Sequence, residues 1–297
     1  MKPNYETLKI IAQEYGFEET IPEKDYWVVC LVKKLSELSL PNGHLVFGGG
    51  TSLVKAHRVM KRFSEDIDFR FISGVILNRT GKSRIKRIIT DFLGSLEDFS
   101  LAEEPEARNE NTLLFYKLNY PRDERFNTSN ALRPFIKVEI FFTGIHYPPV
   151  KCPLISLHNE YERLPQDVEF DCVAMEDTAI DKISSLLWRI GTGGYEPTDI
   201  RHLHDLAMLS DKIIVDDKFK RILNSVYKND ITARTKSDKK LKTSIDAVIA
   251  TLSENKQYAR DYKNYVLNMS YAPDSEILSF EQVQDKFVRL AKKLVLD

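Results

Sequence analysis

The segment over residues 46–71, VFGGGTSLVKAHRVMKRFSEDIDFRF, constrains the fold more than any other part of the chain. It starts in an apolar run, passes through three consecutive glycines and ends in strictly alternating apolar and charged residues. Alternation is typical of a strand that buries one face, and glycines permit a tight turn. With the two residues before it, the segment therefore predicts a strand over 44–47, a helix over about 51–60 and a second strand over 66–71.

Hydrophobic periodicity divides the remaining chain into a mixed first part and a helical second part. Helical spacing follows Thr20, which forms a capping-box pattern with Glu23, and it recurs over 83–97. Strand-like runs cover 112–120 and 134–142, and a strand or two more is expected before about residue 173. The later pattern is helical, over 176–190, 199–209, 216–227, 240–253 and 278–295. We expect an α+β fold with a first domain over 1–160 and a mainly helical second domain over 161–297.

The composition is that of an ordinary folded chain without secretion or membrane signals. The 297 residues are 42% hydrophobic and carry a formal net charge of −1. No stretch reaches the roughly 18 apolar residues of a membrane span, and the N-terminus lacks the apolar run of a signal peptide. Cys30, Cys152 and Cys172 are odd in number and far apart, so they indicate neither a disulfide framework nor a zinc site. We therefore expect a cytoplasmic protein with reduced thiols.

The glycine turn has a chemical interpretation and a plain structural one. Glycines before a helix let backbone N–H groups approach a phosphate, and the helix N-terminus adds positive potential. The sequence matches neither a P-loop nor a G-x-G-x-x-G motif. A turn between strand and helix without any ligand is the alternative.

Three carboxylates are candidates for a metal site. Period-two spacing puts Asp66 and Asp68 on the same side of one strand, where their charges repel unless a cation lies between them. Mg²⁺ and Mn²⁺ prefer such oxygen ligands and complete their shells with substrate phosphates. Glu139 in IKVEIFF joins the pair if its strand lies beside 66–71. Three carboxylates would hold two metals, one to activate an attacking hydroxyl and one to neutralise a triphosphate and its leaving group, which is the positioning and charge neutralisation that phosphoryl and nucleotidyl transfer chiefly need. The alternative is that both aspartates face solvent.

Four motifs in order resemble the AbiEii-type nucleotidyltransferase toxin family, within the DNA polymerase beta-like nucleotidyltransferase superfamily. They are GGTSLVKAH, KRFSEDIDF, AIDKISSLLWRI (179–190) and DIRHLHDLAML (199–209), and PEKDYWV (22–28) resembles the helix before the first motif. The resemblance spans about residues 20–210. It implies a polymerase-beta-like nucleotidyltransferase lobe with a mixed sheet, and a helical C-terminal lobe that completes the active-site cleft.

The resemblance also implies an activity, with a role for each matching residue. The toxin would transfer nucleotides from an NTP to RNA, at the 3′ acceptor end of tRNA, and block translation. Asp66 and Asp68 would bind Mg²⁺ or Mn²⁺ with Glu139 as third carboxylate, and Asp205 would act as a base or orient Lys182. The residues expected to bind the nucleotide are Gly49, Gly50, Thr51, Ser52, Lys55, Ser64 and Lys182. A cognate antitoxin encoded nearby is implied as a partner.

Several competing interpretations stay open. The basic run Arg79, Lys82, Arg84, Lys86 and Arg87 would bind RNA phosphates, or would form a solvated helix face. Asp205 lies four residues after Arg201, a spacing typical of an ordinary intrahelical ion pair. A transferase of the same fold that modifies protein and a catalytically silent nucleotide-binding protein are the alternative functions. Ser64 would be a site where phosphorylation opposes triphosphate binding.

Overall fold

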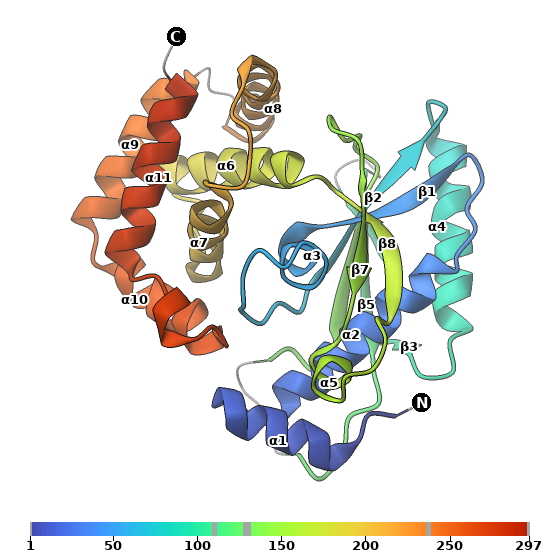
Figure 1. The fold of residues 1–297 in the computed structure, drawn as a ribbon. Helices are drawn as coiled ribbons and strands as arrows, with labels where there is room; N and C mark the ends of the chain where they lie inside the picture. Colours follow the sequence, from blue (N-terminus) through green and yellow to red (C-terminus); the bar gives the residue numbers. More distant parts are fainter. Residues whose placement is uncertain (1, 109–111, 127–131, 236–238, 296–297) are drawn as a thin grey trace. The chain divides into compact units, whose positions relative to one another are not determined.

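The computed structural model describes residues 2–108, 112–126, 132–235 and 239–295, and the chain forms two compact units (Figure 1). The first unit contains residues 1–58 and 63–173, and the second contains 59–62 and 174–297. The domain boundary expected near residue 160 falls before the last strand, β8 (Val168–Cys172), which belongs to the first unit because it pairs with β1 (Gly43–Gly48). The short segment 59–62 leaves the first unit, joins the second and returns.

A mixed sheet is the frame of the first unit. Its remaining strands are β2 (Ile67–Ser73), β3 (Ser100–Leu101), β4 (Glu106–Arg108), β5 (Leu113–Asn119), β6 (Ile136–Phe141) and β7 (Val150–Leu154). The strand order is β3-β5-β6-β2-β1-β8-β7, and β4 pairs with β5. β2 runs antiparallel to β1 and parallel to β6. The expected α+β fold with a mixed sheet is confirmed.

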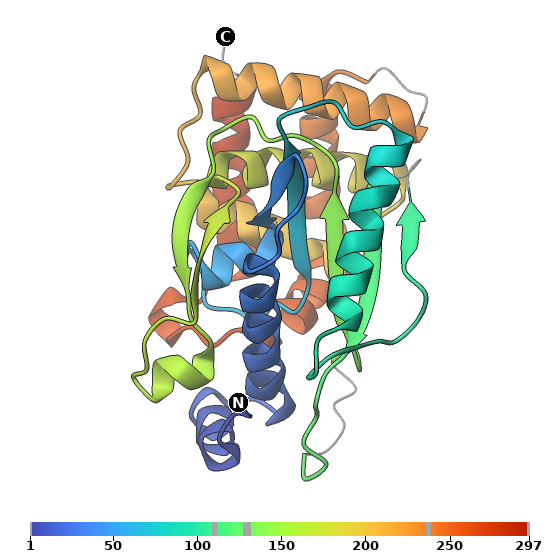
Figure 2. The same cartoon turned by 90° about the vertical axis from the view of Figure 1, so that its right-hand side faces the viewer.

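Two long helices cover one face of this sheet and bury its apolar side. In Figure 2, α2 (Thr20–Ser36, blue) and α4 (Arg79–Gly94, cyan) lie side by side in front of the strands. Trp27 and Leu31 of α2 and Ile85 and Ile89 of α4 share one core with alternate strand residues, among them Phe47, Ile67, Phe69, Val138 and Ile140. Because side chains alternate along a strand, Asp68 and Glu139 lie on the opposite face.

The first unit also contains α1 (Tyr5–Tyr15), α3 (Gly49–Lys55) and α5 (Leu157–Tyr161). The helix predicted over 51–60 is shorter than expected, because residues 59–62 depart to the second unit after Arg58, which has a positive φ of 51°. The predicted capping box at Thr20 is wrong. Thr20 is already helical, Glu19 is the N-cap without a side-chain hydrogen bond, and the buried Thr20 hydroxyl has no hydrogen-bond partner.

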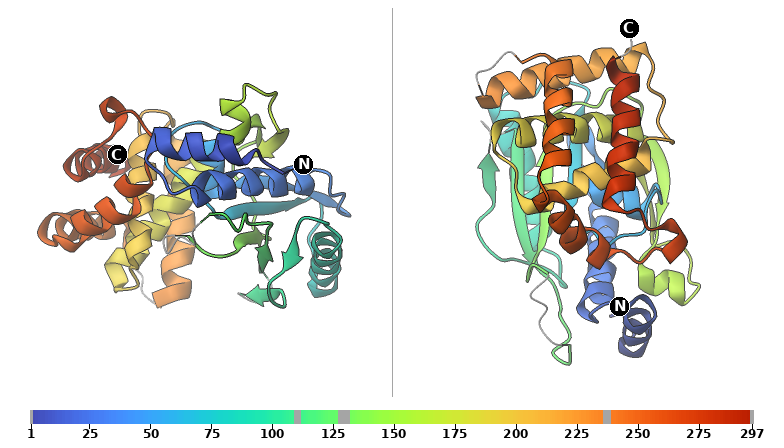
Figure 3. Two further views of the ribbon diagram at one scale, coloured as in Figure 1. Left: turned by 90° about the horizontal axis from the view of Figure 1, so that it is seen from below. Right: turned by 90° about the vertical axis from the view of Figure 1, so that its left-hand side faces the viewer.

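The second unit is helical, as predicted (Figure 3, right). Its helices are α6 (Met175–Thr192), α7 (Ile200–Leu209), α8 (Asp217–Thr235), α9 (Leu241–Glu254), α10 (Gln257–Tyr265) and α11 (Phe280–Val295), with 3-10 turns η1 (Pro197–Asp199), η2 (Leu267–Met269) and η3 (Asp274–Glu276). α6 packs against α7, α8 and α9, while α7 also contacts α10 and α11. The segment 59–62 joins them through a bridge between Arg62 and Ser270. Within the described residues, no helix combines the length and apolarity needed to cross a membrane.

Candidate active site

The glycine turn requires glycine at position 49 for two reasons. Gly49 opens α3 with a φ of +71°, the left-handed region that side chains disfavour. A Cβ atom built on Gly49 would lie 1.9 Å from Oδ2 of Asp68. The turn therefore packs directly against one of the predicted metal ligands. Gly49 and Gly50 are both partly exposed, as an approach of phosphate to their backbone requires.

The strand pairing brings the predicted carboxylates together. β2 and β6 are adjacent and parallel, and Asp68 is directly opposite Glu139. Asp66 immediately precedes β2, two residues before Asp68. The condition that the sequence left open, a strand carrying Glu139 beside 66–71, is thus met.

Basic side chains reach the same cluster. The Nζ atom of Lys137 lies 2.8 Å from Oε2 of Glu139 and 3.4 Å from Oδ2 of Asp66. Arg133 forms a further ion pair with Asp66. Burial disfavours the charged Lys137 ammonium, but the carboxylates of Asp66, Asp68 and Glu139 together outweigh it and raise the pKa of Lys137.

The cluster has the chemistry of a divalent-cation site. Among the described residues, no three His, Cys, Asp or Glu side chains are arranged as ligands of one ion. At this cluster, cationic side chains pair with the carboxylates. Its donors are carboxylate oxygens, which Mg²⁺ and Mn²⁺ prefer, and they already hold a positive charge. The residues present therefore fit a divalent ion.

Hydroxyl groups fasten the glycine turn to the strand that follows. The Thr51 hydroxyl donates to the backbone carbonyl of Asp66 and lies 2.9 Å from Oγ of Ser64. The Ser52 hydroxyl donates to the carbonyl of Gly49 over 3.0 Å. All three hydroxyl side chains are buried and partnered inside the protein. This arrangement favours a role in shaping the turn over the direct nucleotide contacts that the resemblance implies.

Lys55 is placed differently from the expected phosphate contact. Its ammonium forms an ion pair with Asp25, and both side chains are buried. Asp25 also accepts a hydrogen bond of 2.8 Å from the backbone N–H of Leu157. The Lys55 charge is therefore neutralised within the fold, and the geometry favours a structural role for Lys55.

A second charged cluster lies within the helical unit and centres on Asp205. Arg62 donates from Nε to Oδ1 over 3.0 Å and from one terminal nitrogen to Oδ2 over 2.9 Å. The Nζ atom of Lys182 lies 2.7 Å from Oδ2. Burial opposes the charged carboxylate, but Arg62 and Lys182 outweigh it and hold the pKa of Asp205 well below its usual range. A carboxylate held ionised in this way orients Lys182 and is a poor proton acceptor.

The alternative in which Asp205 pairs with Arg201 is wrong. The Arg201 Nε donates to the backbone carbonyl of Thr198 over 3.1 Å, and Asp205 takes Arg62 as its arginine partner. Because Arg62 lies far away in the sequence, helical spacing alone points to the wrong partner.

Two histidines, which the sequence analysis does not single out, complete the cluster. Nδ1 of His202 lies 3.4 Å from Nζ of Lys182, and Nδ1 of His204 lies 3.4 Å from Oδ1 of Asp205. Burial is the main cause that lowers the pKa of both rings, so both are neutral at neutral pH. The spacing of three between His202 and Asp205 was the available signal, because it puts both on one helix face.

Comparison with known proteins identifies the family of this chain. A sequence model of the family described as "Nucleotidyl transferase AbiEii toxin, Type IV TA system" matches residues 33–287. The chain belongs to the AbiEii family. The AbiEii match includes the glycine turn, the three carboxylates, Lys182 and Asp205. No curated protein matches the sequence.

A solved structure is similar to this chain in fold. MenT4, a nucleotidyltransferase toxin from Mycobacterium tuberculosis H37Rv, is similar over 95% of this chain and 98% of its own, with a TM-score of 0.55 and 16% sequence identity. As a member of this family, the chain is a nucleotidyltransferase toxin of a type IV toxin–antitoxin system. Membership implies an antitoxin and a nucleotide as its partners.

The basic run of this AbiEii protein forms the first turns of α4. Asn78 caps the helix by accepting a hydrogen bond of 2.8 Å from the N–H of Gly81. Arg79, Arg84 and Arg87 are exposed, and Lys86 donates to the carbonyl of Pro105 over 2.8 Å. The exposed arginines suit either an RNA contact or a solvated helix face.

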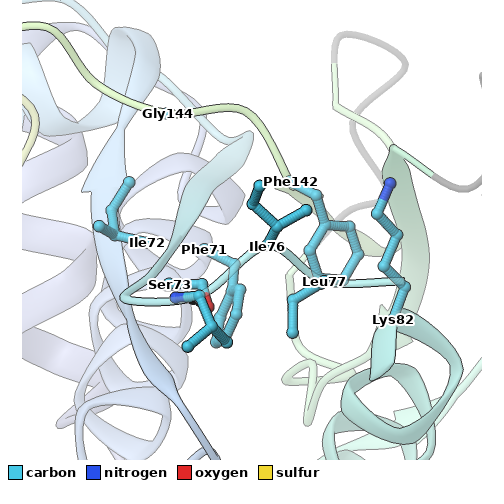
Figure 4. A pocket seen from close by; sticks show the side chains of 9 residues that line it. Phe71, Ile72, Ser73, Ile76, Leu77, Lys82, Phe142 and Gly144 are labelled. Carbon is cyan, nitrogen blue, oxygen red and sulfur yellow. Dashed lines mark hydrogen bonds between the residues drawn. The ribbon is translucent and has the colours of Figure 1, made fainter. Parts of the chain in front are cut away.

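A cavity with both polar and apolar lining residues lies beside the start of α4 (Figure 4). It has a volume of about 310 Å³, and Phe71, Ile76, Leu77, Lys82 and Phe142 are among its lining residues. β2 runs away from Asp68 toward this cavity, so the cavity and the carboxylates lie at opposite ends of the strand. The carboxylate chemistry therefore does not take place in this cavity.

Proposed function

We propose that this AbiEii toxin transfers nucleotides from an NTP to RNA, at the 3′ acceptor end of tRNA, and thereby blocks translation. Pyrophosphate is the leaving group, and an RNA hydroxyl is the nucleophile. The observation that carries the proposal is the register of β2 with β6, which sets Glu139 opposite Asp68 beside the tightly packed Gly49.

Each group of residues has a defined part in the reaction. Asp66 and Asp68 would hold Mg²⁺ or Mn²⁺, with Glu139 as the third carboxylate. The bound ion would neutralise the triphosphate and activate the attacking hydroxyl. The partly exposed backbone of the glycine turn would bind phosphate oxygens. In the second unit, Lys182 would contact nucleotide phosphate as a point charge, with Asp205 fixing its position.

RNA binding is assigned to α4. Arg79, Lys82, Arg84, Lys86 and Arg87 would contact phosphates of the acceptor, because neutralising phosphates supplies most of the affinity for nucleic acid. The exposure of the three arginines supports this assignment. We also propose that the cognate antitoxin is encoded nearby.

Transfer to tRNA is tested directly with labelled nucleotides. The protein is incubated with total tRNA, Mg²⁺ and each α-labelled NTP in turn, beside the variants Asp66→Ala and Asp246→Ala. Asp246 is an exposed aspartate of α9 and serves as the matched control. We expect label in tRNA with the wild type and with Asp246→Ala, and none with Asp66→Ala.

The other outcomes identify the competing functions. Label that appears only in protein would replace the RNA acceptor with a protein hydroxyl. Thermal stabilisation by NTP and Mg²⁺ without any labelled product would instead support a catalytically silent nucleotide-binding protein.

A further inference from the structure

Lys137 lies within the carboxylate cluster and has no role in the function proposed above. It lies two residues before Glu139 on β6, so both side chains point to the face of the sheet that carries Asp68. Its ammonium contacts Glu139 and Asp66, and the exposed fraction of each of these three side chains is 18%. The ammonium is therefore enclosed by two carboxylates from different segments.

The strand pairing gives a second reason to regard this position as specific. Lys137 is directly opposite Lys117 of β5, and like charges in that arrangement destabilise a sheet. The two lysines separate their charges by taking different partners. Lys117 pairs with Glu103 over 2.8 Å, whereas Lys137 pairs with the carboxylate cluster. The ion pairs of Lys137 with the carboxylate cluster thus offset the repulsion between Lys137 and Lys117.

Arg133 contacts the same cluster, but from a more exposed position outside the sheet. It precedes β6, its side chain is 38% exposed, and it divides its charge between Asp66 and Glu65. An exposed arginine outside the sheet can leave Asp66 when a metal ion arrives. Lys137 is more enclosed and is fixed to a central strand, so its ammonium stays between Asp66 and Glu139.

From this geometry we propose that Lys137 is a resident cation of the cluster and takes the place of one metal ion. A metal bridging Asp66 and Glu139 would have to occupy the position of the Lys137 ammonium. The cluster therefore holds one divalent ion, at Asp66 and Asp68, and Glu139 holds Lys137. This inference rests on the proposed function and revises its metal site: Glu139 is no longer a metal ligand, and the two ions expected from three carboxylates become one.

The number of bound metal ions tests the proposal without any measurement of activity. Free Mn²⁺ is followed by electron paramagnetic resonance during titration of the full chain with a non-hydrolysable NTP analogue present. The variants are Lys137→Ala and Lys117→Ala. They change the net charge equally, but only Lys137 lies in the cluster. We expect one Mn²⁺ more per chain in Lys137→Ala than in the wild type or Lys117→Ala.

A second variant keeps the proposal falsifiable if Lys137→Ala does not fold. Glu139→Gln should bind the same number of Mn²⁺ ions as the wild type, because Glu139 is not a metal ligand in this scheme. An equal count in Lys137→Ala and the wild type, or a lost ion in Glu139→Gln, would overturn the role of Lys137 while leaving metal-dependent transfer intact. If the wild type binds no Mn²⁺ beyond the nucleotide alone, the metal-dependent function itself fails.

Discussion

Gly49 combines a left-handed backbone with direct packing against Asp68, so its replacement tests the glycine turn at the scale of one residue. We expect Gly49→Ala to destabilise the first unit by about 1–2 kcal/mol through backbone strain. Its Cβ would also displace Asp68, and a misplacement of about 1 Å costs roughly 100-fold in rate. Urea unfolding and the tRNA labelling rate measure the two effects.

Gly94 supplies the matched control for Gly49. It lies in α4 with open space around its Cα and without a positive φ. Gly94→Ala should therefore leave activity unchanged and stabilise the helix by up to about 1 kcal/mol. Equal losses of activity in the two variants would contradict the contact with Asp68 as the cause.

The ion cluster around Asp205 makes a second prediction at this scale. Asp205→Asn leaves the buried Arg62 and Lys182 without their shared counter-charge, which costs about 3–5 kcal/mol for a buried pair. The chain has two tryptophans, Trp27 and Trp188, so a Trp27→Phe background leaves Trp188 of α6 as a reporter of the second unit. Urea unfolding followed by its fluorescence measures the loss. Arg201→Ala is the control. A comparable loss of unfolding free energy in that variant would show that the stabilisation does not depend on the ion pairs of Asp205.

The pH dependence of that stability follows from the sign of the pKa shift. The pKa of Asp205 is lowered by folding, so its stabilising contribution is complete above the unfolded value of about 3.9 and is lost as the pH falls through the lower folded value. In the Trp27→Phe background, the free energy of unfolding should therefore fall more steeply below about pH 4 than it does with Asp205→Asn added. Parallel curves of unfolding free energy against pH for the two proteins would mean that Asp205 is not held ionised.

At the scale of elements, the salt dependence of tRNA binding distinguishes an RNA-binding role of α4 from a solvated helix face. Replacing Arg79, Arg84 and Arg87 with Gln should weaken tRNA binding and reduce the slope of log affinity against log salt by about 2 to 3. NTP binding should not change, because these residues lie outside the carboxylate cluster. Filter binding over a range of salt concentrations measures the slope.

The control for α4 is a basic set on another helix. Arg289, Lys292 and Lys293 are exposed on α11 and carry the same total charge. Their replacement should leave the slope nearly unchanged. An equal reduction from both sets would show that net charge, and not α4, governs the affinity.

The elements also indicate what the sequence could predict. Alternation over 67–71 was enough to place β2 and to set Asp68 on the polar face, because side-chain period is a local property. The arginine partner of Asp205 was not predictable, because Arg62 reaches it from outside the helix. Lys137 was missed for the same reason: its position beside Asp66 depends on the pairing of β2 with β6, which no local pattern encodes.

At the scale of the whole molecule, the two units are not two consecutive halves of the sequence. Residues 59–62 follow the glycine helix and precede Asp66 and Asp68, yet they belong to the helical unit. The backbone N–H of Tyr271 donates to the carbonyl of Lys61 over 3.0 Å, and Arg62 forms its bidentate pair with Asp205. A boundary inferred from composition could not include this segment, because its four residues carry no distinctive pattern.

This arrangement predicts that the helical unit is incomplete without residues 59–62. The fragment 174–297 should be less stable than the same unit in the Trp27→Phe full chain, with Trp188 fluorescence as the common measurement in urea. Arg62→Ala in the full chain removes the guanidinium but retains the Lys61 backbone contact and the ion pair of Lys61 with Glu276. The free energy of unfolding of Arg62→Ala should therefore lie between that of the fragment and that of the Trp27→Phe full chain. If the fragment is as stable as the intact chain, the segment 59–62 is not part of the helical unit, and Asp205 must be held by Lys182 alone.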